Sequence, residues 1–285
     1  MNIKKLVATA FVGLTAVTLA ACGGGASSSS SSQSSQAANT EDKKIVVVAS
    51  PAPHAEILEA AKPILAKEGY DLQINVVNDY VTPNQIVHAK DADANYFQHT
   101  PYLEKFNAEN NLDLVSVGNV HIEPMAIYSK KYKSLDELPE GATVYASTNP
   151  AEVGRFLNFF VKAGLITLKE GVNPITAQLS DIAENKKNIQ IKTEIAPEFL
   201  VKTYENNEGD AVIINSNFAI DAKLSPIKDS IALEDKSSPY ANLIAVRPDS
   251  KDSEKIKALV KVLQGEEIQK FINEKYTDGS VIPAK

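Results

Sequence analysis

The sequence is poor in cysteine and arginine and contains no tryptophan, and the shortage of cysteine excludes two kinds of site. The only cysteine among 285 residues is Cys22, so neither a disulfide framework nor a zinc site built from several cysteines is possible. Only two of the 29 basic residues are arginines, Arg155 and Arg247. Acidic residues number 36, the formal net charge is −7 and the pI is near 5.3. Because a non-specific nucleic-acid binder needs a basic face, this composition predicts no nucleic-acid partner.

Motifs for covalent catalysis and for phosphate binding are also missing. The sequence has no G-x-S-x-G nucleophile elbow and no glycine-rich phosphate loop. The adjacent acidic pairs Asp136-Glu137 and Glu266-Glu267 belong to a polar turn and to a solvated helix end. These absences predict a protein that is not an enzyme and that carries no cofactor.

Four scattered histidines raise the question of a metal site: His54, His88, His99 and His121. A zinc ion takes three or four histidine, cysteine or carboxylate ligands from the protein. No His-x-x-x-His pair is present, no acidic partner is evident at ligand spacing, and His88 falls in the middle of a predicted helix. We therefore expect no metal, and we expect His99 to hydrogen-bond or pack beside Phe97 in a cleft.

Residues 1–21 have the pattern of a secretory signal peptide. Lys4 and Lys5 supply its positive start, and residues 6–19 are apolar or neutral. That stretch of about 14 residues is short for a hydrocarbon core of about 30 Å, so a retained membrane helix is not expected. The leader ends in Leu19-Ala20-Ala21-Cys22, which resembles a bacterial lipobox, where the cysteine carries the lipid. The alternative is cleavage at an Ala-x-Ala signal, with Cys22 incidental.

The rest of the chain divides into a tether and a folded part. Residues 22–44 begin with Cys22 and are rich in serine, so we expect a lipidated, disordered tether. From residue 45 on, short β-branched runs alternate with amphipathic helical segments. The expected strands are 45–49, 72–77, 93–97, 142–146, 189–193, 210–214 and 243–246, with a long extended stretch at 114–130. The expected helices are 54–68, a short one from Pro83, 102–109, 151–163, 198–205 and 253–276, the last broken near Gly265.

This alternation predicts an α/β protein with two lobes. A β-α-β order is typical of parallel sheets covered by helices. The first lobe is expected at 45–130, the second at 131–236, and 237–285 is expected to return to the first. Ligands of such sheets lie beyond the carboxyl ends of the strands, which here means the cleft between the lobes.

The loops at the strand ends hold aromatic residues, amides and one arginine. Arg155 lies in the first turn of a predicted helix, and its planar guanidinium suits a carboxylate. The alternative for Arg155 is an ion pair, for example with Glu152, one turn earlier. Arg247 follows a strand and precedes Pro248, so we expect a structural or solvent-facing role. Arginine, amides and aromatic rings together favour a small zwitterion with an apolar tail as ligand.

With these loops and the lipobox, the chain resembles the NlpA/MetQ family of methionine-binding lipoproteins, the substrate-binding components of bacterial methionine ABC importers. The resemblance covers essentially the whole mature chain. Seven segments in order carry it: PHAEIL at 53–58, DYVTPN at 79–84, ANYFQHTPYL at 94–103, GR at 154–155 before AGLI at 163–166, AVIINSNFA at 211–219, PYANLIAVR at 239–247 and VIPA at 281–284.

The resemblance implies a type II periplasmic-binding-protein fold with the ligand held between the lobes. It implies that Tyr80, Phe97, His99 and Tyr102 wall the pocket for the ligand side chain. It implies that Arg155 holds the carboxylate, while Asn215 and Asn242 hydrogen-bond the amino-acid backbone. The implied partners are L-methionine or a related small zwitterion, and the permease and ATPase of an importer; another amino acid is an alternative ligand. The protein is expected to be a monomer, anchored by its lipid on the extracytoplasmic side of the cell membrane.

The chain departs from the family pattern just before Arg155. Many members read Asn-Asp-Pro-Ser/Thr-Asn there, and this chain has Thr148-Asn149-Pro150-Ala151-Glu152. Glu152 could contact a ligand ammonium group, neutralise Arg155, or favourably charge the helix N-terminus. The first option permits a longer ligand, such as a methionine-containing dipeptide. The sequence is also compatible with two rival functions, a metal-binding lipoprotein and a surface adhesin.

Overall fold

The computed structural model describes residues 43–235 and 238–284, which belong to one compact unit of residues 39–285. The predicted signal peptide, the predicted lipidation site at Cys22 and nearly all of the predicted tether lie outside the described residues. Among the residues that are described, no helix is both long enough and apolar enough to cross a membrane.

The first sheet has six strands in the order β13-β4-β12-β3-β1-β2. Their bounds are β1 Lys44–Ala49, β2 Asp71–Val76, β3 Ala94–His99, β4 Val115–Ile122, β12 Ala241–Val246 and β13 Ile282–Pro283. Strand β1 pairs in parallel with β2 and β3, while β12 runs antiparallel between β3 and β4. Because β1 and β3 are parallel, the loops that follow them begin at the same edge of the sheet, which brings their polar residues together.

The second sheet has five strands in the order β11-β5-β10-β6-β9, and β7 and β8 form a separate hairpin. The bounds are β5 Ala126–Tyr128, β6 Thr143–Ser147, β7 Ile166–Leu168, β8 Ile182–Asn185, β9 Gln190–Ile195, β10 Ala211–Ile214 and β11 Ser230–Leu233. Strand β5 pairs with β10, so the chain leaves the first sheet before Ala126 and not after residue 130, where the first lobe was expected to end. The reason is that β5 continues the apolar character of the extended stretch, so the sequence shows no break there.

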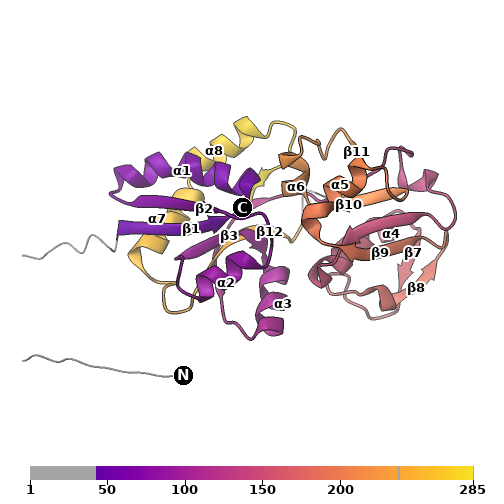
Figure 1. Cartoon of the computed structure of the whole chain (residues 1–285), viewed down its shortest axis with the longest axis horizontal. Helices are drawn as coiled ribbons and strands as arrows, with labels where there is room; N and C mark the ends of the chain where they lie inside the picture. The colour runs from indigo at the N-terminus through magenta and orange to yellow at the C-terminus, as the bar shows by residue number, and fades with distance from the viewer. Residues whose placement is uncertain (1–42, 236–237, 285) are drawn as a thin grey trace, which may run out of the picture. The chain divides into compact units, whose positions relative to one another are not determined.

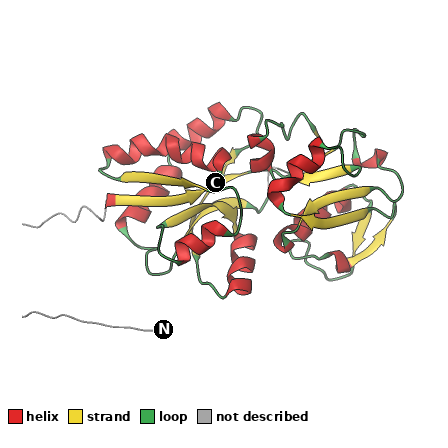
Figure 2. Ribbon diagram, viewed as in Figure 1, coloured by secondary structure: helices red, strands yellow, loops and turns green. Residues whose placement is uncertain are grey.

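Helices flank both sheets (Figure 2). Those around the first are α1 Glu56–Lys67, α2 Thr82–His88, α3 Thr100–Asn110, α7 Glu254–Leu263 and α8 Glu266–Lys275, with the π-helical turn η2 Pro51–Ala55 before α1. Those around the second are α4 Val153–Lys162, α5 Leu200–Glu205 and α6 Ser216–Asp221, with the short 3-10 helices η3 Leu135–Glu137, η4 Pro150–Glu152, η5 Leu179–Asp181 and η6 Pro197–Phe199. The C-terminal helices α7 and α8, yellow in Figure 1, return to pack against α1.

Each sheet has its own apolar core. The spacing of the α1 segment predicts an apolar stripe of Ile57, Leu58, Ala61, Ile64 and Leu65. In the first core, four of these are buried, and Ile64 packs against the core half-buried. In the second, the side chains of Phe156 and Phe160 on α4 are buried with those of β6 and β10. The predicted break at Gly265 is confirmed as well, because this residue is extended and separates α7 from α8.

Candidate ligand-binding site

A cavity of about 370 Å³, including its opening to solvent, lies where residues of the two sheets meet. Seven of its lining residues were singled out from the sequence: Tyr80, His99, Tyr102, Glu152, Arg155, Asn215 and Asn242. The other lining residues are His54, Gln98, Glu123, Asn149, Ser216 and Asn217.

Aromatic rings form one side of the cavity. The ring centroids of Tyr80 and Tyr102 lie 6.1 Å apart, and Phe97 packs against both at 5.9 and 5.7 Å. Phe97 is not among the lining residues, so it supports the two tyrosines from behind. The Tyr80 hydroxyl donates to Asn217 Oδ1 at 2.7 Å, and the Tyr102 hydroxyl donates to the Tyr80 carbonyl at 2.6 Å. The first of these bonds joins the loop after β2 to α6, across the cavity.

Arg155 lies in the first turn of α4 and is buried, with 6% of its surface exposed. It donates through Nε and Nη2 to the two carboxylate oxygens of Glu234, at 3.0 and 2.6 Å, and through Nη2 to the carbonyl of Glu123 at 2.8 Å. Its guanidinium carbon lies 4.5 Å from the ring centre of Tyr240. Glu234, and not Glu152, is therefore the ion-pair partner, and it occupies one edge of the guanidinium.

This ion pair changes the pKa values of both partners. Burial alone would raise the pKa of the Glu234 carboxyl, but the charge and hydrogen bonds of Arg155 lower it below its ordinary value. Burial alone would likewise lower the pKa of Arg155, and the Glu234 carboxylate raises it above its ordinary value. The pair is therefore ionised at neutral pH, with a bidentate geometry that holds the arginine in one orientation.

Glu152 is the most buried carboxylate of the cavity, with 1% of its surface exposed. One oxygen, Oε1, accepts a hydrogen bond from Asn215 Nδ2 and lies 3.9 Å from His99 Nε2. Burial lowers the pKa of His99, so this histidine is neutral at pH 7. The other oxygen, Glu152 Oε2, is buried and has no hydrogen-bond partner among the described residues. An unpaired buried carboxylate oxygen is costly, so this atom is ready to accept a donor from a ligand.

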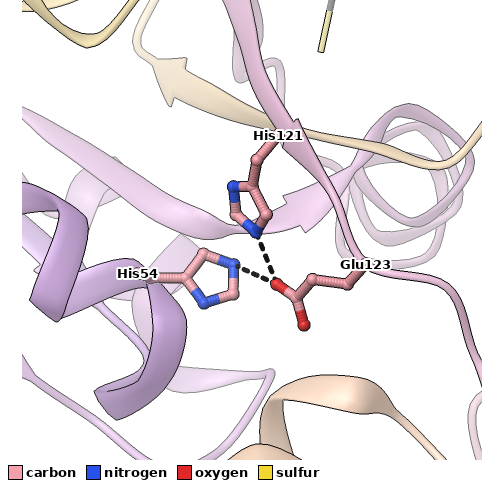
Figure 3. A group of neighbouring side chains, drawn as sticks. All are labelled: His54, His121 and Glu123. Carbon is pink, nitrogen blue, oxygen red and sulfur yellow. Dashed lines mark hydrogen bonds and ion pairs between the residues drawn. The ribbon is translucent and has the colours of Figure 1, made fainter. Parts of the chain in front are cut away.

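A second polar group, His54, His121 and Glu123, lies beside the cavity and was not found from the sequence. His54 belongs to η2, His121 is the penultimate residue of β4, and Glu123 is the first residue after that strand. Figure 3 shows both imidazoles directing a nitrogen at the same carboxylate oxygen of Glu123. Both Nε2–Oε1 distances are short, 3.2 Å from His54 and 2.6 Å from His121. Burial lowers the pKa of His54 to about 4 and that of His121 to about 3, and it raises the pKa of Glu123.

The spacing of this group corrects the expectation that no acidic residue stands near a histidine at ligand spacing. Residues 121 and 123 alternate along an extended segment, so their side chains share a face. The His-x-Glu pattern in a predicted strand was the signal that could have found the pair. Arg247 was predicted to have a structural or a solvent-facing role. The structure shows the structural one, because its Nη1 donates to the carbonyls of Val87 and Ala92, both at 2.8 Å.

Comparison with known proteins places this site in a family. The family model of the NlpA lipoprotein matches residues 45–285. The methionine-binding lipoprotein MetQ of Bacillus subtilis is 52% identical over 237 residues, which cover 82% of this chain and 86% of that protein. The D-methionine-binding lipoprotein MetQ of Escherichia coli is 41% identical over 228 residues, which cover 79% and 83%.

A solved structure agrees with these relatives. The nutrient binding protein of Burkholderia cenocepacia, solved bound to methionine, is 38% identical, has a TM-score of 0.79 and covers 85% of this chain and 100% of its own. The similarity confirms the two-lobed α/β fold of a type II periplasmic binding protein. The chain belongs to the NlpA family of lipoproteins.

Proposed function

We propose that this protein captures methionine, or a close relative of it, and delivers it to the permease and ATPase of an ABC importer. It does so without catalysis, as a monomer held by a lipid on Cys22 at the outer face of the cell membrane. The relatives' names and the methionine-bound neighbour support the ligand class. The observation that carries the proposal is the buried cavity, which joins aromatic rings to an arginine and to an unpaired carboxylate.

The contacts favour one orientation of the ligand. The thioether side chain lies against Tyr80 and Tyr102, which Phe97 supports, and His99 borders it. Arg155 Nη2 already donates to Glu234 and to the Glu123 carbonyl, so the ligand carboxylate meets Arg155 Nη1. Asn215 and Asn242 hydrogen-bond the backbone atoms of the amino acid.

The ammonium group of the ligand belongs at Glu152 Oε2. This oxygen is buried without a hydrogen-bond partner in the described part of the chain, and a charge-assisted bond to an ammonium group would satisfy it. Arg155 forms its ion pair with Glu234, so its guanidinium does not satisfy this oxygen. A ligand with a free ammonium group is therefore favoured over one whose amine is blocked.

A methionine-containing dipeptide is the second candidate. Tyr80, Tyr102 and Asn149 line both the cavity and a second hollow, which continues toward Asp79 and Glu198. A ligand longer by one residue would extend in that direction. The adjoining hollow is the observation that favours the dipeptide.

Isothermal titration calorimetry tests both candidates on residues 39–285, unfolded and refolded to remove any ligand carried over from the cell. The arms are L-methionine, D-methionine, glycyl-methionine and N-acetyl-methionine. We expect one site for L-methionine with Kd of about 1 μM or tighter, which corresponds to about −8 kcal/mol. N-acetyl-methionine should bind at least 100-fold more weakly. Tighter binding of the dipeptide would select the second candidate, and no binding in any arm would refute the proposed function.

A further inference from the structure

The group of His54, His121 and Glu123 brings together the kinds of atom that bind a transition metal ion. One ligand atom from each residue lies within 4.8 Å of the other two, and all three side chains are buried. They come from two separate parts of the first sheet, the turn after β1 and the end of β4 (Figure 3). Two imidazoles and one carboxylate are a common protein ligand set for zinc.

The two distances to the Glu123 oxygen suit an ion after one small movement. Ligand atoms about 2.1 Å from a tetrahedral zinc ion lie about 3.4 Å from one another. The distance from His54 Nε2 to Glu123 Oε1, 3.2 Å, is already close to this value. The distance from His121 Nε2 to the same oxygen is 2.6 Å, as in a hydrogen bond, and it must lengthen by about 0.8 Å when the ion replaces the proton.

The residues around this group supply a hydrogen-bond partner for one ligand and a route from the cavity. The Tyr96 hydroxyl contacts His121 Nδ1, the ring nitrogen that faces away from Glu123. Such a partner fixes the orientation of a metal-bound imidazole. Asn242 Oδ1 lies 2.9 Å from His54 Nε2, so this oxygen is close enough to serve as a fourth ligand. His54, Glu123 and Asn242 all line the cavity, which gives an ion a way in and leaves a position for water.

We propose that His54, His121 and Glu123 form a binding site for a divalent transition metal ion of the zinc class, on the wall of the ligand cavity. The ion replaces the contacts that Glu123 Oε1 makes with the Nε2 atoms of both histidines, and it neutralises the buried negative charge of Glu123. Because the site uses none of the residues assigned to methionine except Asn242, metal binding and methionine binding are separately measurable.

The test is calorimetry with zinc chloride on residues 39–285, carrying no polyhistidine tag and freed of metal with a chelator that is then removed. We expect one zinc ion per chain. Cobalt should bind in its place and give the visible absorption of a four-coordinate ion. The variants Glu123→Gln and His121→Gln should each weaken zinc binding at least 100-fold, because even the loss of an outer partner costs 10- to 100-fold.

Two further variants separate coordination from general damage. His88→Gln removes an exposed histidine of α2 and should leave zinc binding unchanged. Tyr96→Phe keeps all three ligands and should weaken binding about 10-fold. If the wild-type protein does not bind zinc, or if Glu123→Gln binds it as tightly, the metal site is refuted. Methionine binding by the same sample, measured in parallel, would then show that the proposed function still stands.

Discussion

The buried ion pair between Arg155 and Glu234 leads to a quantitative prediction for the variant Glu234→Gln. The two side chains are 5% and 10% exposed and share two parallel hydrogen bonds. Glutamine keeps the volume but removes the charge, and its amide nitrogen cannot accept from Arg155 as the second carboxylate oxygen does. Breaking one side of a buried pair typically costs about 3–5 kcal/mol, because the remaining charge is left uncompensated. The hydrogen bond from the Met125 N–H to Glu234 Oε2, 3.0 Å long, is weakened as well.

The same pair gives the loss a defined pH dependence. The folded-state pKa of Glu234 lies below its ordinary value of 4.5, so its stabilising contribution is complete above pH 4.5. The contribution is lost as the pH falls from 4.5 through the lower folded-state pKa. The free-energy difference between wild type and Glu234→Gln should therefore be about 3 kcal/mol or more at pH 7, and it should shrink at pH 3.

Urea unfolding followed by circular dichroism measures this difference. Glu109→Gln is a matched control, because Glu109 pairs with Lys105 at 3.1 Å but both side chains are about half exposed. Exposed pairs contribute about 0–1 kcal/mol, so the control should change stability by less than about 1 kcal/mol. A Glu234→Gln variant that loses no more than the control, or that loses as much at pH 3 as at pH 7, would refute the reasoning.

Four other substitutions test the ligand contacts and the backbone packing around two glycines. Glu152→Gln should weaken L-methionine binding about 10-fold or more in calorimetry, because the charge-assisted bond to the ammonium group is lost. The weak binding of N-acetyl-methionine, which has no ammonium group, should stay the same. An equal loss for both ligands would argue against an ammonium contact. Tyr80→Phe removes the hydrogen bond to Asn217 and should raise the dissociation rate of methionine several-fold in stopped-flow measurements. An unchanged rate would show that this bond does not help to retain the ligand. Gly154→Ala should lower the free energy of unfolding by about 1–3 kcal/mol, because a Cβ there meets the carbonyls of Pro174 and Ile175. Gly118→Ala, whose Cβ meets only the side chains of Gln264 and Val260, should cost less.

The fold was predictable wherever the sequence pattern is long and periodic. Helix α1 is buried along one stripe, so its apolar residues recur every three or four positions. Strand β1 is covered on both faces, so its apolar residues are consecutive, and both patterns are visible in the sequence. The hairpin β7–β8, the strand β11 and the helix α6 were not predicted. Each of these elements has six residues or fewer, and such short segments are stabilised by tertiary packing more than by their own pattern.

The candidate site was predictable only in part, for a related reason. Strand-end position and family resemblance indicated the loops of Tyr80, Arg155 and Asn242, and the structure brings these residues to one cavity. Glu234 is separated from Arg155 by 79 positions and follows β11, the strand that was missed, so nothing local indicated the pair. His121 and Glu123 were visible as an alternating pair, but their third partner, His54, reaches them only through the sheet order β4-β12-β3-β1.

The most direct test of the central claim is a crystal structure of residues 39–285 grown with L-methionine. We predict one methionine in the cavity, with its ammonium group within hydrogen-bond distance of Glu152 Oε2, its carboxylate at Arg155 and its thioether chain against Tyr80 and Tyr102. A methionine bound in the reverse orientation would contradict the roles given to Glu152 and Arg155. A cavity without methionine, at a concentration that saturates the B. subtilis relative, would contradict the proposed function.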